Sequence, residues 1–253
     1  MSSSCCTPAL AAPTTPASHV HHHQHDLSRI NAEYWKYILP PFFPLYFPAN
    51  PASTDSHALA IHSPWVAAIH SQMGTFLTTN LPFLSLPGGT LLDYACGSGL
   101  ASLPIAPQFT RIVGIDVAPE MISKFNATYS GVGIEARGVV GDIMTGGLPE
   151  ETGFDAVLCS MALHHMADVE DAVARLAGRV RVGGVVVLID WAEGDVRGGT
   201  AAETMPQGAI VKMEEALLKA GCEGVEVRVL EAESEVPDGK GMRLGFARGT
   251  RKE

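Results

Sequence analysis

The stretch LLDYACGSGLAS, residues 91–102, decides the fold. An apolar run ends in an acid, two glycines follow two residues apart, and a helical pattern begins after them. Glycines let the backbone of such a strand-to-helix turn approach another group closely, and the start of a helix offers free N–H groups. The turn therefore predicts either a ligand-binding loop or a tight packing contact within the chain.

Strands and helices alternate on both sides of this turn. The apolar runs predict strands at residues 90–95, 111–117, 134–140, 154–162 and 185–191. A short helix is expected after Gly99, and longer helices are expected in APEMISKFNATY and in DVEDAVARLAGRV, the latter with Asp168 as its N-cap. A last helix near 207–220 precedes two strands that read as an antiparallel hairpin. The order predicts an α/β fold with a doubly wound, mostly parallel, seven-stranded sheet.

The chain of 253 residues suits one large domain with an appended segment. Residues 1–26 are rich in Ser, Thr, Pro and Ala and end in a histidine run, which predicts a disordered tail without a metal site. Residues 27–88 predict an N-terminal helical cap or lid, interrupted by prolines at 40–51 and by Pro64. Residues 89–253 then form the ligand-binding domain.

Composition excludes several classes of function. Seventeen basic against 27 acidic residues give a net charge of −10, which argues against nucleic-acid binding. The five cysteines form no CxxC pair, as expected in a reducing compartment. No apolar run approaches the roughly 18 residues that a membrane span needs, and no secretory signal is visible. We therefore expect a cytoplasmic protein that handles small molecules, of undetermined oligomeric state.

Two kinds of cofactor could bind at the turn, a dinucleotide or a nucleoside without phosphate. A dinucleotide site has a third glycine three residues after the second, and Ser102 stands in that position. Asp93 lies just before the turn, where a carboxylate would repel a pyrophosphate and attract a cationic amino group. Asp116, at the end of the second strand, suits ribose hydroxyls in either case. Together the two acids favour a nucleoside with a cationic tail and no phosphate.

At these residues the chain resembles the class I S-adenosylmethionine-dependent methyltransferases, especially the small-molecule branch that includes quinone-pathway methylases. The family's DxGxGxG turn is matched by Asp93, Ala95, Gly97 and Gly99; alanine replaces the first glycine, a mild departure if the backbone there has ordinary dihedrals. The resemblance covers about residues 85–250. It implies S-adenosyl-L-methionine as cofactor, with Asp116 on the ribose and Asp142 of GDI on the adenine. The cofactor-binding residues expected in full are Asp93, Ala95, Cys96, Gly97, Gly99, Asp116, Val117, Met121, Asp142, Ile143, Ser160, Met161 and Tyr34.

Methyl transfer from a sulfonium is a direct displacement, so the protein's main task is to align the reacting atoms. A general base is needed only if the acceptor must lose a proton. His164 and His165 follow the fourth strand and are the candidate catalytic residues, as base or as groups that orient the acceptor. The alternative is that one packs beside the cofactor and the other faces solvent.

Three functions remain open at this point. The first is an active methyltransferase with a small-molecule acceptor. The second is a catalytically silent cofactor-binding protein, because the proline-rich insertion at 40–51 and the short segment after the fifth strand depart from the family's lid. The third is an NAD(P)-dependent oxidoreductase, supported only by the glycine turn and Asp116. The acceptor and the atom that receives the methyl group are not identified by the sequence.

Overall fold

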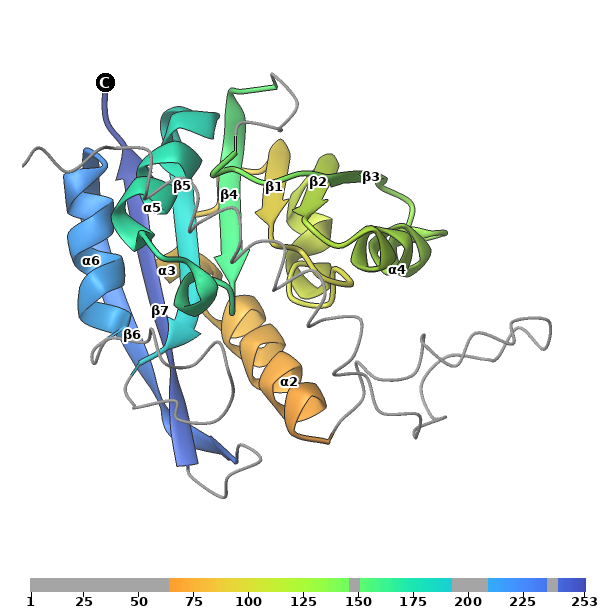
Figure 1. Ribbon diagram of the computed structural model, residues 1–253, viewed down its shortest axis with the longest axis horizontal. Coiled ribbons are helices and arrows are strands. Elements are labelled where there is room, and N and C mark those ends of the chain that lie inside the picture. Colours follow the sequence, from red (N-terminus) through yellow and green to blue (C-terminus); the bar gives the residue numbers. More distant parts are fainter. Residues whose placement is uncertain (1–63, 146–150, 193–208, 236–240) are drawn as a thin grey trace, which may run out of the picture.

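The computed structural model of the protein describes residues 64–145, 151–192, 209–235 and 241–253. Fourteen elements follow one another in these ranges (Figure 1). The helices are α2 (Pro64–Thr79), α3 (Leu81–Leu84), η2 (Leu103–Gln108), α4 (Pro119–Tyr129), η3 (Leu163–His165), α5 (Val169–Arg179) and α6 (Ala209–Lys219). The strands are β1 (Thr90–Tyr94), β2 (Arg111–Asp116), β3 (Glu135–Val140), β4 (Phe154–Ser160), β5 (Val180–Trp191), β6 (Cys222–Glu235) and β7 (Gly241–Arg251).

The strands form one seven-stranded sheet in the order β3-β2-β1-β4-β5-β7-β6. Strands β3, β2, β1, β4 and β5 are parallel to one another, whereas β7 is antiparallel to both β5 and β6. The expected fold class, an α/β sheet that is mostly parallel with a C-terminal antiparallel hairpin, is therefore confirmed. Strand β7, which is antiparallel to both of its neighbours, lies between β5 and β6, so β6 is the edge strand.

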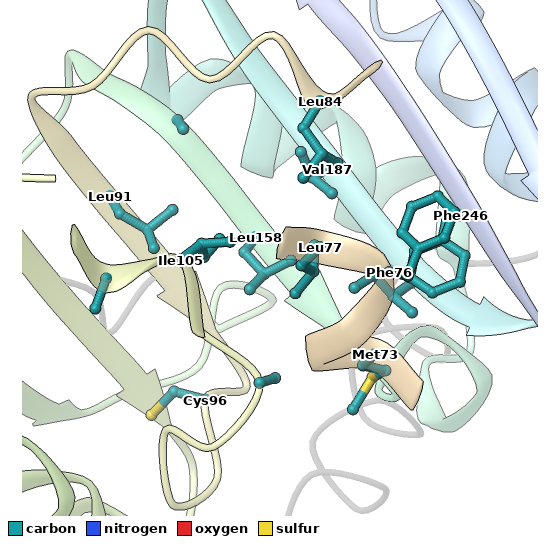
Figure 2. Close-up of a cluster of buried hydrophobic side chains, with 14 of the residues drawn as sticks. Met73, Phe76, Leu77, Leu84, Leu91, Cys96, Ile105, Leu158, Val187 and Phe246 are labelled. Carbon is teal, nitrogen blue, oxygen red and sulfur yellow. The ribbon is translucent and has the colours of Figure 1, made fainter. Parts of the chain in front are cut away.

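Helices cover both faces of the sheet, because its central strands carry apolar side chains on both faces (Figure 1). One buried cluster joins α2, α3, η2 and α4 to one face, and a second joins α5 and α6 to the other. In the first cluster the rings of Phe76 and Phe246 are stacked with centroids 3.6 Å apart. Figure 2 shows further members of this cluster: Met73, Leu77, Leu84, Leu91, Ile105, Leu158 and Val187.

The described part of the predicted N-terminal cap, residues 64–88, belongs to this packed layer. Helix α2 is described from Pro64, whose fixed φ and missing N–H suit a first helical turn. The residues before Pro64 lie outside the described ranges, so the expected interruption of the helical pattern there remains a prediction. Residues 27–63, with Tyr34 and the proline-rich insertion, lie outside the described residues, as does the tail at 1–26. The three domain boundaries remain predictions.

The helix expected after Gly99 differs from its prediction. The chain first makes hydrogen-bonded turns and then the 3₁₀ helix η2, which begins only at Leu103. Pro107 inside this segment lacks the N–H that an α-helix would need, and short 3₁₀ pieces tolerate that loss. The N–H groups close to Gly97 and Gly99 therefore come from a turn, not from the start of an α-helix.

Two expectations about helix ends are met. Asp168 caps α5, with its Oδ1 accepting from the N–H of Asp171 at 2.9 Å. Gly221, at φ 78°, follows α6 as the expected helix terminator. No helix within the described ranges has both the length and the apolar character that crossing a bilayer demands.

Candidate functional site

The candidate site lies beyond the carboxyl ends of β1 and β4, where the strand order reverses. From β1 the chain passes to β2 on one side, and the later strand β4 pairs with β1 on its other side. Ligands bind at such a switch point in open parallel sheets. The turn at 95–102 after β1 and the turn at 161–165 after β4 both begin here. The two turns contain Ala95, Cys96, Gly97, Gly99, Met161, His164 and His165 of the residues that the sequence nominated.

Asp93, at the end of β1, is fully buried and incompletely satisfied. Its Oδ2 accepts a hydrogen bond from Ser102 Oγ, which also pairs with the hydroxyl of Tyr129 at 2.8 Å. Its Oδ1 has no hydrogen-bond partner within the described residues. Burial raises the pKa of Asp93 to about 7, the Ser102 bond opposes this rise, and the charge of Asp116 adds to it. A buried carboxyl with a spare oxygen is costly unless a donor or cation reaches it.

The two glycines of the turn have different roles. Gly97 has a φ of 51°, and a Cβ placed on it would have no atom within 4 Å. Gly99 has a φ of 80°, and a Cβ there would lie 2.8 Å from the Tyr129 ring and 2.9 Å from the Phe125 ring. Gly99 therefore allows α4 to pack closely, whereas the space beside Gly97 is open to a ligand.

Two residues other than glycine hold left-handed backbone at the same end of the sheet. Ala95 follows β1 with φ 53°, and Met161 follows β4 with φ 52°. The backbone at Ala95 is thus not ordinary, and the alanine in place of the family's glycine is a strained substitution rather than a mild one. Such conformations cost about 1–3 kcal/mol each and concentrate at functional sites.

Asp116 fixes the glycine turn to the start of α4. Its Oδ2 accepts from Gly97 N and its Oδ1 from Ala118 N, each at 2.9 Å. Burial raises its pKa, while backbone N–H donors, including that of Val117, pull in the other direction. Met121 lies buried in the first turn of α4. Asp116 therefore both shapes the turn and holds a carboxylate beside it.

Asp142 is tied to the end of β1 through Tyr94. The Tyr94 hydroxyl donates to Asp142 Oδ1 at 3.3 Å and accepts from Ile143 N at 3.1 Å, while Met144 N donates to the same carboxylate oxygen at 2.9 Å. Burial raises the pKa of Tyr94, and the neighbouring Asp142 raises it further. Tyr94 was not among the residues expected from the sequence, although it stands directly after Asp93 in the DYACGSG run.

His164, in the turn after β4, forms a pair with Asp190 near the end of β5. His164 Nδ1 lies 2.7 Å from Asp190 Oδ1, and the backbone N–H of His164 donates to Asp190 Oδ2 at 3.1 Å. Trp191 N also donates to Asp190 Oδ1, at 2.8 Å. Sequence reasoning missed Asp190; the available signal was an acid inside the apolar strand VVVLIDW.

The electrostatics of this pair differ from those of Asp93. Burial raises the pKa of Asp190, but the charge and ring nitrogen of His164 and two backbone donors outweigh burial and hold it below its usual range. The ring of His165 lies with its centroid 4.0 Å from that of His164. Burial, followed by the charge of His164, lowers the pKa of His165 to about 3, so His165 is neutral at physiological pH.

Cys96 is buried within the glycine turn, and its N–H donates to Ile115 O at 3.0 Å. Burial, then the charges of Asp93 and Asp116, raise the pKa of its thiol. A thiol of that kind is a poor nucleophile. The cysteines within the described residues, Cys96, Cys159 and Cys222, are all free and buried.

The structure gathers the described candidates into one region. Asp93, Ala95, Cys96, Gly97 and Gly99 lie on or after β1, and Ser160, Met161, His164 and His165 end or follow β4. Asp116 ends β2 and Val117 and Met121 follow it, while Asp142 and Ile143 follow β3. Tyr34 lies outside the described residues. The roles of all these residues as ligand contacts remain predictions.

Comparison with known proteins agrees with this geometry. Residues 92–188 match the family model described as a methyltransferase domain. The chain is 32% identical over 125 residues to an uncharacterized methyltransferase of Schizosaccharomyces pombe, covering 47% of this chain and 44% of that protein. It is 32% identical over 138 residues to an uncharacterized methyltransferase of Mycobacterium tuberculosis, covering 54% and 65%. A ubiquinone biosynthesis O-methyltransferase of Stutzerimonas stutzeri is 31% identical over 105 residues, covering 41% and 44%. The chain thus spans about half the length of these relatives.

Solved structures share the fold at lower identity. The N-methyltransferase NodS of Bradyrhizobium japonicum, in complex with S-adenosylhomocysteine, superposes with a TM-score of 0.56 at 20% identity, covering 80% of this chain and 94% of that one. A putative methyltransferase of Haloferax volcanii, in complex with the Trm112 activator, gives a TM-score of 0.55 at 21% identity, covering 75% and 96%. At this level of identity the comparison concerns the fold alone.

Proposed function

We propose that this chain, which belongs to the class I S-adenosylmethionine-dependent methyltransferases, binds S-adenosylmethionine in the crevice between β1 and β4 and transfers its methyl group to a small-molecule acceptor. One observation carries the proposal: the buried carboxyl of Asp93 keeps an unpartnered oxygen beneath a turn that is open at Gly97. A ligand with a cationic amino group and no phosphate satisfies that oxygen, and the amino-acid end of S-adenosylmethionine is such a group.

The residues around the crevice fit the rest of this cofactor. Asp93 would pair with the amino group, Asp116 with the ribose hydroxyls, and Asp142 with Ile143 would hold the adenine. Ser160 and Met161 would line the methionine side. When bound, the cofactor supplies a methyl group on a positively charged sulfur, already joined to a good leaving group. The protein's own contribution is then to align the acceptor, which lowers such barriers by up to about 7–11 kcal/mol.

The structure gives Ser102 a role that disfavours the oxidoreductase alternative. Ser102 occupies the place of the third glycine in a dinucleotide fingerprint, and its hydroxyl donates to Asp93. Glycine could not make this hydrogen bond. The same residue that departs from the dinucleotide pattern therefore supports the carboxyl that a pyrophosphate would avoid.

The acceptor is proposed to be a small molecule. The chain is acidic overall, and among its relatives a ubiquinone biosynthesis enzyme acts, by its name, in the synthesis of a small molecule. The cytoplasm remains the expected location. The segments that motivated the catalytically silent alternative, 40–51 and the region after β5, lie outside the described residues.

Calorimetry with three ligands tests the proposal. S-adenosylmethionine and S-adenosylhomocysteine should bind, and NAD should not. Binding of NAD with no response to either sulfur ligand would contradict the cofactor assignment. A labelled methyl donor offered with a panel of small acceptors then separates an active enzyme from a silent binding protein, because only the former yields labelled product.

A further inference from the structure

We propose that His164 and Asp190 form a proton-accepting pair and that the methyl acceptor is a hydroxyl group, with His164 as general base and Asp190 as its positioning residue. This inference rests on the proposed methyltransferase function and deepens it by naming the acceptor class. It adds a residue, Asp190, that no sequence pattern had assigned to the site.

The geometry of the pair fixes one tautomer of the imidazole. Asp190 is fully buried and ends the apolar strand β5, while the side chain of His164 is 13% exposed. The 2.7 Å contact between Nδ1 and Asp190 Oδ1 places the ring proton on Nδ1, since a carboxylate only accepts. Nε2 is then the nitrogen left to accept a proton. A buried carboxylate that orients a histidine in this way is the arrangement by which hydrolytic enzymes activate a hydroxyl nucleophile.

The surroundings favour His164 over His165 as the base. Within the described residues, the His164 ring contacts two titratable groups, Asp190 from β5 and His165 from its own turn. The carboxylate of Asp190 stabilises the imidazolium that forms when His164 takes a proton. His165, whose pKa burial lowers to about 3, is too weak a base for this task and adds no charge beside His164.

The backbone holds the pair beside the proposed cofactor crevice. His164 lies in η3, three residues after Met161, whose left-handed backbone turns the chain at the end of β4. Met161 N donates to Ile189 O at 2.7 Å, and His164 N donates to Asp190. The turn after β4 is therefore bound to β5 at both of these points, so the imidazole is held on a rigid segment rather than a free loop.

The chemistry of the acceptor follows from the need for a base. As the displacement proceeds, the acceptor oxygen forms a bond to the methyl carbon and the methyl–sulfur bond breaks, with its electron pair going to sulfur. The hydroxyl proton passes to His164 Nε2 and then to solvent. A neutral amine attacks without losing a proton first, and a thiol with a pKa near 8.5 ionises readily. A hydroxyl, with a pKa of about 10 for a phenol, is the nucleophile that gains most from a built base.

A structural role for Asp190 makes different predictions. Because Asp190 also accepts two backbone N–H bonds, its loss would disturb the turn even without catalysis. We would therefore compare His164→Gln and Asp190→Asn with two matched controls. His70→Gln changes a histidine in α2, and Asp168→Asn changes an acid to another good N-cap.

The experiment has two readouts for each protein. Calorimetry gives the affinity for S-adenosylhomocysteine, and a labelled methyl donor gives the rate of transfer to catechol, aniline and thiophenol as hydroxyl, amine and thiol probes. We expect catechol to be methylated, and both His164→Gln and Asp190→Asn to lower kcat by about 10²–10⁴-fold with S-adenosylhomocysteine affinity within about twofold of the parent. The controls should retain the parent rate.

The split between kcat and KM separates positioning from structure. In Asp190→Asn, a positioning role lowers kcat and leaves the KM values for S-adenosylmethionine and catechol unchanged, because the base is misaligned while the binding residues stay in place. A purely structural role disturbs the turn after β4 and raises both KM values. Raised KM values in Asp190→Asn, hydroxyl transfer that survives His164→Gln, or absence of transfer to catechol overturns this inference. Failure of the parent to bind S-adenosylhomocysteine would instead overturn the proposed function.

Discussion

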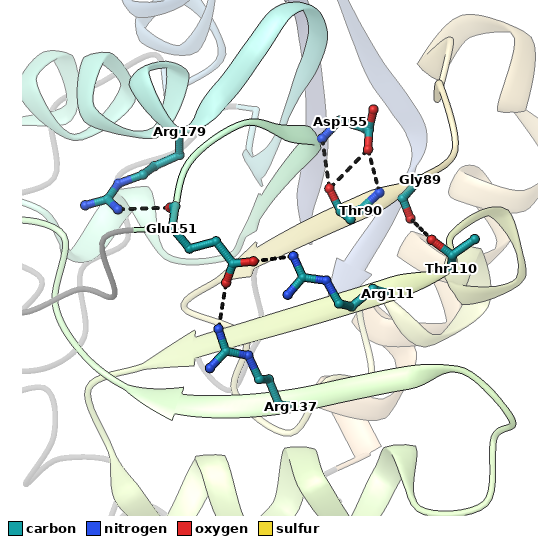
Figure 3. Close-up of polar contacts among 8 residues, drawn as sticks. All are labelled: Gly89, Thr90, Thr110, Arg111, Arg137, Glu151, Asp155 and Arg179. Atoms are coloured by element: carbon teal, nitrogen blue, oxygen red, sulfur yellow. Dashed lines mark hydrogen bonds and ion pairs between the residues drawn. The ribbon is translucent and has the colours of Figure 1, made fainter.

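The two ends of the sheet treat their polar groups in opposite ways. At the amino ends of the strands, Glu151 accepts from Arg111 and from Arg137, the latter at 2.6 Å (Figure 3). Its backbone carbonyl also accepts from Arg179 at 3.1 Å. Asp155 nearby accepts from the N–H of Thr90 at 2.7 Å and from its hydroxyl at 3.1 Å. Arg181 Nε donates to the other oxygen of Asp155 at 2.7 Å, so Glu151 and Asp155 are each paired with arginine and hydrogen-bonded through both oxygens.

At the carboxyl ends the satisfaction is incomplete. Asp93 keeps an oxygen without a partner in the described part of the chain, and Ala95 and Met161 hold left-handed backbone. At the amino ends, the carboxylates of Glu151 and Asp155 are thus hydrogen-bonded by other residues of the chain. At the carboxyl ends, one oxygen of Asp93 is left for a ligand to satisfy. Among these acids, the one that the described chain leaves unsatisfied, Asp93, is the one that lies in the candidate site.

The largest effect should come from replacing one acid at each end of the sheet, Asp93 and Asp155. Asp93→Asn removes the counter-charge for the cofactor's amino group, and loss of one partner of a buried ion pair costs about 3–5 kcal/mol. We expect calorimetry at pH 8 to show affinity for S-adenosylhomocysteine reduced at least about 100-fold, with no loss of folding stability. Asp155→Asn should do the reverse, lowering stability by about 1–3 kcal/mol in denaturant unfolding and leaving affinity unchanged. Equal effects of both variants on affinity would break the comparison.

The pH dependence of binding should be the next largest effect. Between the ordinary pKa of 3.8 and about 7, the folded, ligand-free protein holds a proton on Asp93 that the unfolded chain has lost. The contribution of Asp93 to stability therefore falls as pH rises through this window and is constant above it. A cationic ligand must displace that proton, so affinity should fall by up to about tenfold per pH unit below pH 7. Calorimetry across pH measures this, and Asp93→Asn should abolish the dependence.

A smaller effect should come from the strained backbone after β1. Ala95→Gly relieves a left-handed alanine and should stabilise the protein by about 1 kcal/mol. The matched change Ala174→Gly, at an exposed position within α5, should destabilise it by about 1 kcal/mol. Thermal or denaturant unfolding of the two variants checks the signs. Destabilisation by both substitutions would show that Ala95 is not strained.

The smallest effect should come from replacing Glu151, at the amino ends of the strands. Glu151→Gln weakens ion pairs with Arg111 and Arg137, which hold the pKa of Glu151 below its usual range while partial burial opposes them. These side chains are partly exposed, so we expect a loss of about 1 kcal/mol or less, diminishing at high salt. Cofactor affinity should be unchanged. A clear loss of affinity would link the amino end to the site.

Much of the fold followed from the sequence because its signals were local. Periodic apolar runs located the strands, and Asp168 and Gly221 marked helix ends by their own hydrogen bonding and backbone preference. The 3₁₀ form of η2 was less predictable, because it depends on two prolines acting on a segment already bent by the glycine turn.

The site was predictable where residues cluster in sequence and not where they meet through the fold. The turn at 93–99 and Asp116 could be nominated together, since strand ends of a parallel sheet meet at one edge. The His164–Asp190 pair joins residues 26 positions apart, one in η3 after β4 and the other in β5, and only the pairing of β4 with β5 brings them together. The strain at Ala95 is a backbone property that residue identity does not reveal.

The most direct test of whether Asp93 binds the cationic amino group compares two ligands on two proteins. S-adenosylhomocysteine carries the cationic amino-acid tail, and 5′-methylthioadenosine lacks it but keeps the nucleoside. Calorimetry at pH 8 should show the parent protein binding S-adenosylhomocysteine far more tightly than methylthioadenosine, and Asp93→Asn should lose most of that preference. A preference of equal size in both proteins would contradict the account, because the tail would then be recognised by groups other than Asp93.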